Sequence, residues 1–135
     1  MSIPGYQEFM LPLLRLAADG REHSIAEAMG TLAADMGITL QDRELMLPSG
    51  TQTMYYNRVT WAITYLTKSI LLEKTGRGRF MIAPRGQDVL RRNPARIDNS
   101  FLEQFPEYQE FKSKRARKAV ETRKTGAVSD RANHS

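Results

Sequence analysis

The residues best suited to recognise another molecule are concentrated between positions 56 and 68. This stretch combines hydroxyl, amide, aromatic and cationic side chains, which can donate, accept or stack but do not form a hydrolytic triad. Asparagine and arginine side chains make paired hydrogen bonds with the edges of adenine and guanine, respectively. The stretch is therefore a candidate for contact with DNA bases, and its predicted site consists of Tyr56, Asn57, Arg58, Thr60, Trp61, Thr64, Tyr65 and Lys68.

Two further arginines stand in a glycine-bearing loop. The string Thr75-Gly76-Arg77-Gly78 directly precedes Arg79. Hydrophobic packing explains such cations poorly, whereas arginines at a glycine-rich tip are suited to contact phosphate oxygens or the minor groove of DNA. Arg77 and Arg79 therefore complete the predicted DNA-binding site.

Some of these residues also have a simpler structural interpretation. Arg58 could be a surface arginine of an amphipathic helix, and Trp61 could close the core because it borders the apolar residues Val59 and Ala62. Tyr56 could pack at the start of a helix instead of stacking or binding a phosphate. DNA contact is the favoured interpretation for Arg58, and both interpretations stay open for Trp61.

Catalytic chemistry is not predicted. The chain has no cysteine, which excludes thiolate catalysis, and its two histidines, His23 and His134, are too far apart for a zinc site. One class of magnesium-dependent nucleases uses an acidic residue on one strand and an Asp/Glu-x-Lys string on the next. The only Glu-x-Lys string is Glu110-Phe111-Lys112, and its nearest acids are too close in sequence to form a separate strand. We therefore expect no active site, cofactor or metal here. His23 stands one residue before the cap of a predicted helix, and we expect it to lie on the surface.

Helical spacing of apolar residues predicts the elements that precede the candidate site. The first helix is expected from Pro4 to Asp19, with a bend at Pro12, which cannot donate a backbone hydrogen bond. Ser24 and Glu27 form a capping box, which predicts a second helix over residues 25–36. Thr39 is suited to cap a short third helix over residues 40–47.

The candidate site itself falls on a fourth helix and a hairpin. Val59, Ala62 and Leu66 form one apolar stripe of a helix that begins at Tyr55 or Tyr56 and ends at Lys68. Two short runs, 71–74 and 79–82, flank the loop 75–78 and predict a two-stranded hairpin. Pro84 then begins a helix that ends near Arg92. Helices followed by a basic hairpin indicate a mainly α fold with a small β-hairpin, the winged helix-turn-helix.

Charge is unevenly distributed along the chain. The whole protein has a net charge of +5, but residues 51–96 contain nine basic and two acidic side chains, and residues 1–50 contain three and seven. Such segregation makes one face of a small domain positive and favours binding of a polyanion. Double-stranded DNA is therefore the predicted partner. Formation of a homodimer is a further possibility that the sequence leaves undecided. We expect a cytoplasmic protein, because the sequence has neither a signal peptide pattern nor an apolar run of membrane-spanning length.

The C-terminal part divides into two segments by composition. Residues 97–112 place Phe101, Phe105 and Tyr108 among acids, and we expect this acidic-aromatic arm to pack on the domain formed by residues 1–96. Residues 113–135 contain almost no large apolar side chain, and this basic segment is predicted to be a disordered linker or tail.

Several strings together resemble the N-terminal domain of Mrr-type restriction endonucleases. They are the run Tyr56-Asn57-Arg58-Val59-Thr60-Trp61-Ala62, the following Leu71-Leu72-Glu73, and Phe80-x-Ile82 with Gly86; the opening IPGYQEFMLPLLRLAADG is similar as well. The resemblance covers about residues 2–95. The resemblance implies a winged helix that binds DNA. In that family the domain is fused to a nuclease domain of the PD-(D/E)xK type, which cuts foreign DNA bearing modified bases.

The sequence departs from that family pattern at two positions. Relatives usually have Ala-Gly before Leu-Leu-Glu, where this chain has Ser69-Ile70, and a β-branched residue is costly at positive φ. Relatives usually have Thr before the last helix, where this chain has Ala83, which cannot cap it. The predicted function is target recognition in an Mrr-like restriction system. The alternative is a stand-alone transcriptional regulator or a module for protein contact or dimerisation.

Overall fold

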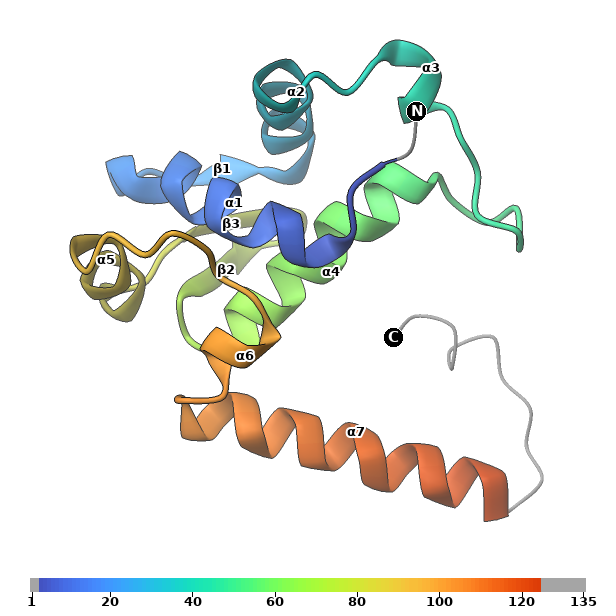
Figure 1. Ribbon diagram of the computed structural model, residues 1–135, viewed down its shortest axis with the longest axis vertical. Coiled ribbons are helices and arrows are strands. Elements are labelled where there is room, and N and C mark those ends of the chain that lie inside the picture. Colours follow the sequence, from blue (N-terminus) through green and yellow to red (C-terminus); the bar gives the residue numbers. More distant parts are fainter. Residues whose placement is uncertain (1–2, 125–135) are drawn as a thin grey trace.

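A computed structural model describes residues 3–124 and shows a mainly helical fold with a small antiparallel sheet (Figure 1). The N-terminal segment is divided into a 3-10 turn η1 (Tyr6–Phe9), the helix α1 (Met10–Leu16) and a 3-10 turn η2 (Ala17–Asp19). Pro12 is the third residue of α1, a position where a backbone N–H has no partner within the helix. The proline is therefore accommodated by starting the α-helix just before it, after a 3-10 turn.

The next two helices begin with side-chain caps. In α2 (Ile25–Met36) the backbone N–H of Glu27 donates to Ser24 Oγ over 3.0 Å, as predicted. In α3 (Leu40–Arg43) the N–H of Asp42 donates to Thr39 Oγ1 over 3.0 Å. The third helix is shorter than predicted, because the backbone beyond Arg43 turns into an ordered loop in which Met46 forms a bridge with Thr53.

Helix α4 (Met54–Lys68) carries most of the predicted site. It is capped by Thr53, whose Oγ1 accepts from the N–H of Tyr56 over 3.2 Å. Its other end is closed by two backbone bonds, from Ile70 to the carbonyl of Thr67 and from Leu71 to that of Leu66. This motif requires a left-handed residue after the helix, and Ile70 takes that role with φ 63°. The β-branched residue is thus accepted at the turn between helix and hairpin.

The sheet has three strands in the order β1-β3-β2. Strands β2 (Leu72–Gly76) and β3 (Arg79–Ile82) form the predicted hairpin, closed by Arg77 and Gly78. Strand β1 (His23–Ser24) pairs with β3 and places His23 opposite Phe80. The sequence analysis does not predict β1, because two residues are too few to show an alternating pattern.

Helix α5 (Pro84–Arg91) follows the hairpin and, as its sequence indicates, has no side-chain cap at Ala83. It packs closely on the segment that follows α4: a Cβ placed on Gly86 would lie 2.3 Å from the carbonyl oxygen of Leu71 and 2.7 Å from Cγ1 of Ile82. Only glycine therefore fits at this crossing, which positions α5 against the base of the hairpin.

Two helices follow α5. Helix α6 (Asn99–Leu102) and the start of α7 (Pro106–Lys124) bring Leu102, Phe105 and Tyr108 into the core. Helix α7 then continues as a long rod along one edge of the molecule (Figure 1). Residues 113–124 of the predicted disordered segment are thus helical in this structure, and residues 125–135 lie outside the described part.

Local interactions explain why this basic segment is helical. Glu107 and Glu110 precede the basic residues of α7, which suits the helix dipole. Lys112 pairs with Glu103, and Lys114 lies 3.9 Å from Glu110, one turn away. A prediction based on apolar content overlooks these charge interactions.

The core lies between α1, α2, α4 and the sheet. Phe9 and Tyr55 meet edge to face with ring centroids 5.7 Å apart, and the Tyr55 hydroxyl donates to the carbonyl of Met29 over 2.7 Å. Each fully buried large apolar side chain contributes about 1.5–3 kcal/mol to folding. The largest of the fully buried side chains are Tyr55, Phe9, Phe80, Met10, Leu13, Leu14, Leu32, Leu66, Leu71, Leu72, Ile97 and Leu102.

Candidate nucleic-acid interface

One row of α4 stays open towards solvent. Helical spacing places Asn57, Thr60 and Thr64 along this row, beside Tyr56 and Lys68, and each of the five is exposed or half-buried. Thr60 Oγ1 donates to the carbonyl of Asn57 over 3.1 Å, which leaves the hydroxyl oxygen able to accept from another molecule. The first turn of α4 contains no acidic residue, so the partial positive charge of its N-terminus is not neutralised there. We call these five residues the outward row.

Arg58 lies on the other side of the same helix turn. Its Nη1 donates to the carbonyl oxygens of Ile3 and Pro4, over 3.2 and 3.0 Å. These hydrogen bonds hold the N-terminal segment against α4. Arg58 thus positions the N-terminal segment through Nη1, and its predicted contact with DNA stays a prediction.

Tyr65 and Trp61 lie where α4 meets α7. Tyr65 is only 7% exposed and contacts Tyr6, Tyr108 and Phe111, with ring centroids 5.0, 6.0 and 5.5 Å away. Burial, followed by the neighbouring Tyr6 hydroxyl, raises the pKa of Tyr65. Tyr65 was predicted on the outer face, and the structure corrects this because the aromatic side chains of α7 cover it.

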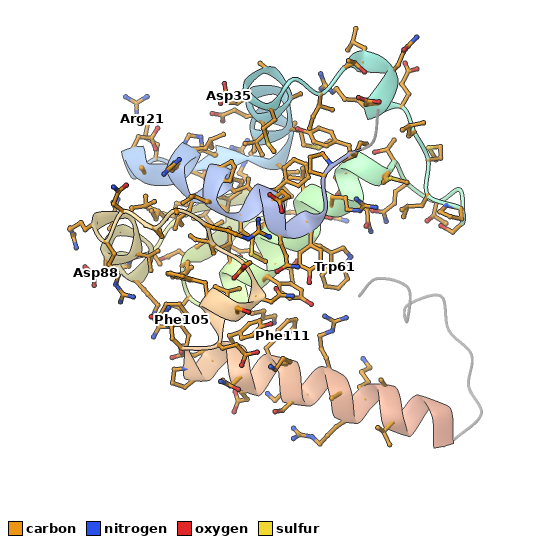
Figure 2. The ribbon with its side chains drawn as sticks, in the orientation of Figure 1. Arg21, Asp35, Trp61, Asp88, Phe105 and Phe111 are labelled. Carbon is orange, nitrogen blue, oxygen red and sulfur yellow. The ribbon has the colours of Figure 1, made fainter. Side chains whose placement is uncertain are left out.

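Arg115 of α7 completes this aromatic cluster. Its guanidinium group lies over Trp61 at 5.1 Å from the ring centroid and donates to the Tyr65 hydroxyl over 2.5 Å. Lys68 Nζ lies 5.7 Å from the centre of the Phe111 ring. Figure 2 shows Trp61 on the side of α4 that faces α7, and Phe111 rising from α7 towards it. Trp61 thus joins two helices, a role intermediate between the two interpretations left open by its sequence position.

The two hairpin arginines are held near the start of α2. The carbonyl of Gly78 accepts from the N–H of Ile25 over 2.9 Å, which fixes the hairpin tip relative to that helix. Arg79 Nη1 lies 3.6 Å from Glu22 Oε1, and both side chains are about half exposed. Arg77 is exposed, and the described residues include no ion-pair partner for it. An exposed ion pair of this kind is weak enough to be exchanged for a phosphate.

The sequence predicts His23 on the surface, but in the structure His23 is buried, with only 7% exposed. Its Nδ1 lies 2.8 Å from Glu27 Oε2 and its Nε2 lies 2.9 Å from Asp19 Oδ1. Burial lowers the pKa of His23, but the hydrogen bonds to the two carboxylates outweigh it and raise the pKa overall. The protonated ring can donate to both, so it links η2, β1 and α2 beneath the hairpin.

Arg115 is the residue that sequence reasoning missed. The available signal was the spacing of Tyr108, Phe111 and Arg115 at intervals of three and four residues, which places them on one helix face. In residues 3–124, three or more His, Asp or Glu side chains nowhere converge in a group that could hold a metal ion. Nor does that part of the chain contain a helix with the length and apolar character needed to cross a membrane.

Comparisons with known proteins identify relatives. Residues 6–92 match the family model described as the Mrr N-terminal domain. The type IV methyl-directed restriction enzyme EcoKMrr of Escherichia coli (strain K12) is 33% identical over 95 residues, which are 70% of this chain and 31% of that enzyme. The chain thus aligns with less than a third of the enzyme's length. No solved structure matches the chain.

Proposed function

Because the chain belongs to the family of Mrr N-terminal domains, we propose that it is a winged-helix domain that binds duplex DNA for a restriction system. In this proposal α1, α2 and α4 are the three helices, α4 is the recognition helix, and the β2–β3 hairpin is the wing. The strand order β1-β3-β2 and the hairpin that follows α4 support this assignment.

The outward row of α4 is the observation on which the proposal depends. It offers an amide at Asn57, hydroxyls at Thr60 and Thr64, an aromatic ring at Tyr56 and a cation at Lys68. An α-helix fits the major groove, where asparagine can make paired hydrogen bonds with adenine. Asn57 is therefore the proposed base-reading residue, with Tyr56 and the threonines beside it.

The hairpin arginines supply affinity in this proposal. Arg77 and Arg79 would contact phosphates next to the groove that α4 occupies, and such contacts carry no sequence information. The bond between Gly78 and Ile25 supports this role, because it holds the tip in a defined place. Base selection would then come from α4 alone.

Binding to duplexes of identical sequence, with and without methylated bases, tests the proposal. The relative is a methyl-directed enzyme, and we expect this chain to bind the methylated duplex more tightly. Arg77→Gln should weaken binding to both duplexes equally and reduce the slope of log K against log salt concentration by about one. Arg91→Gln, on α5, is the matched control for net charge. Equal binding of both duplexes would show that the chain does not recognise methylated bases. A changed preference between the duplexes in Arg77→Gln would show that the hairpin reads bases.

Cleavage is assigned to a different part of such a system. We propose that a nuclease domain, fused or separate, acts on the DNA that this domain selects. The length of the relative, of which only 31% aligns, is compatible with an additional domain there.

Self-association is a second candidate role, favoured by one observation. Three large apolar side chains, Leu40, Leu45 and Met46, are exposed on α3 and the following loop, with Leu40 75% exposed. This apolar surface suits contact with a second copy of the chain. Light scattering tests it: a dimer that the double variant Leu40→Ser, Met46→Ser converts to a monomer supports the role, and a monomeric wild type excludes it.

A further inference from the structure

Positive charge is concentrated on one stretch of α7. Residues 112–120 contain five basic and no acidic side chains. Helical spacing places Lys114, Arg115, Arg117 and Lys118 on one half of the helix, and Ala116, Ala119 and Val120 on the other. Lys114 and Arg117 are exposed, and the ion pair of Lys114 with Glu110 is long, at 3.9 Å between exposed groups. Sequence reasoning assigned no defined surface to these residues.

Contacts between α4 and α7 show which way this basic half is directed. Residues three apart on a helix step around its axis by about 60°. Along this helix Tyr108 contacts Tyr65, and Phe111, one step on, contacts both Tyr65 and Lys68. Tyr65 is on the side of α4 covered by Tyr6, whereas Lys68 belongs to the outward row. The next step of the same rotation brings Lys114 to the side of α7 that borders the outward row, and Lys118 lies between Phe111 and Lys114 on that side, whereas Arg117, three steps from Tyr108, faces away from α4.

The aromatic cluster holds this orientation. Arg115 lies over Trp61 and the Phe111 ring lies edge-on to Tyr65, so α7 cannot rotate about its axis without breaking these contacts. Helices α4 and α7 then diverge, and the C-terminal half of α7 projects away from the body of the domain (Figure 1). The basic side chains of this half are thus presented by a fixed rod rather than by a flexible tail.

We propose that Lys114 and Lys118 of α7 form a second DNA-binding surface, which contacts the phosphate backbone of the duplex beside the groove read by α4. The inference rests on the proposed DNA-binding function. Phosphates are the expected ligand because the surface offers exposed cations, of which Lys114 has only a long, exposed ion pair with Glu110, and because it borders the row that would face the bases. Arg115 acts as a positioning residue in this arrangement.

The test compares two variants of the full chain with equal changes in charge. Lys114→Gln, Lys118→Gln removes the two proposed contacts, and Arg91→Gln, Arg92→Gln removes two exposed charges from the C-terminal end of α5. Affinity for a fluorescent duplex is measured as a function of salt. Each phosphate contact contributes about 0.9 to the slope of log K against log salt concentration. The loss of one contact should therefore weaken binding about eightfold more at 0.1 M salt than at 1 M salt. The α7 variant should lose about two from the slope on every sequence, and the α5 variant should lose much less.

A third variant tests the fixed orientation without changing charge. Phe111→Ala removes the ring that lies against Tyr65 and Lys68, and we expect it to weaken binding several-fold while the circular dichroism spectrum keeps the domain's signal. Tighter binding would overturn the proposal, because α7 would then cover α4. Unchanged binding would also overturn it, because α7 would then act only through its charge and not through its fixed orientation. Equal losses in the α7 and α5 variants would also overturn it. If the wild type does not bind DNA, the proposed function fails together with this inference, whereas normal wild-type binding with an unaffected α7 variant refutes the inference alone.

Discussion

Replacing Ile70 tests the conformation at the end of α4. Ile70 has φ 63° and its side chain is 43% exposed, so a β-branched residue occupies the left-handed region with only partial burial in return. That region costs an L-residue about 1–2 kcal/mol, whereas the extra freedom of glycine in the unfolded chain costs about 0.5–1 kcal/mol. The balance predicts that glycine at this position is more stable than alanine by about 0.5–1 kcal/mol.

The comparison of Ile70→Gly with Ile70→Ala isolates this effect. The two variants differ only in the Cβ atom, which alanine keeps and glycine lacks, so their difference reports chiefly the backbone conformation. Urea unfolding followed by circular dichroism gives the free energies, and the melting temperatures should differ by about 2–5 °C in favour of glycine. Ile70→Asn should lie between them, because asparagine tolerates the left-handed region. An alanine variant as stable as the glycine variant would refute the left-handed turn.

Three other substitutions have defined outcomes. Gly86→Ala should destabilise the fold by about 1–3 kcal/mol in urea unfolding, because its Cβ would lie 2.3 Å from the carbonyl of Leu71, and an unchanged midpoint would contradict this packing. Arg58→Met should cost about 1.5 kcal/mol of stability through two lost hydrogen bonds, while Asn57→Ala should leave stability within about 0.5 kcal/mol and reduce the preference between DNA sequences; the reverse pattern would exchange their roles. The raised pKa of His23 means that its protonated ring stabilises the folded state fully below about pH 6.5 and that this contribution is lost as the pH rises through the raised value. The difference in melting temperature between wild type and His23→Gln should therefore shrink above about pH 6.5, and a constant difference would show that the ring does not act through its charge.

Local patterns were sufficient to predict most of the helices and the hairpin. Ser24 and Thr39 cap their helices as their positions indicate, since capping depends on residues only three positions apart. The glycines around Arg77 predict the hairpin for the same reason. The left-handed Ile70 is also consistent with the chain position where relatives usually have glycine. These features depend on short-range interactions that a single sequence contains.

The side-chain roles within α4 could not be predicted in the same way. Periodicity separates a buried stripe from the rest of the helix, but it cannot tell which of the remaining residues another segment covers. Arg58 is held by Ile3 and Pro4, more than 50 residues away, and Tyr65 is covered by a helix about as distant. The position of His23 between two carboxylates shows the same limit, because its burial depends on pairing with Phe80 in β3. Long-range packing decided all three outcomes.

Binding of the full chain to duplex DNA as a function of salt is the most direct test of the proposed function. The basic residues of the hairpin, α4 and α7 predict contact with about three to six phosphates, so log K should fall linearly against log salt concentration with a slope of about −3 to −5. Binding should be measurable by fluorescence anisotropy on a labelled duplex at low salt and should be lost progressively at high salt. A flat titration, or no binding at low salt, would contradict the assignment of this domain to DNA recognition.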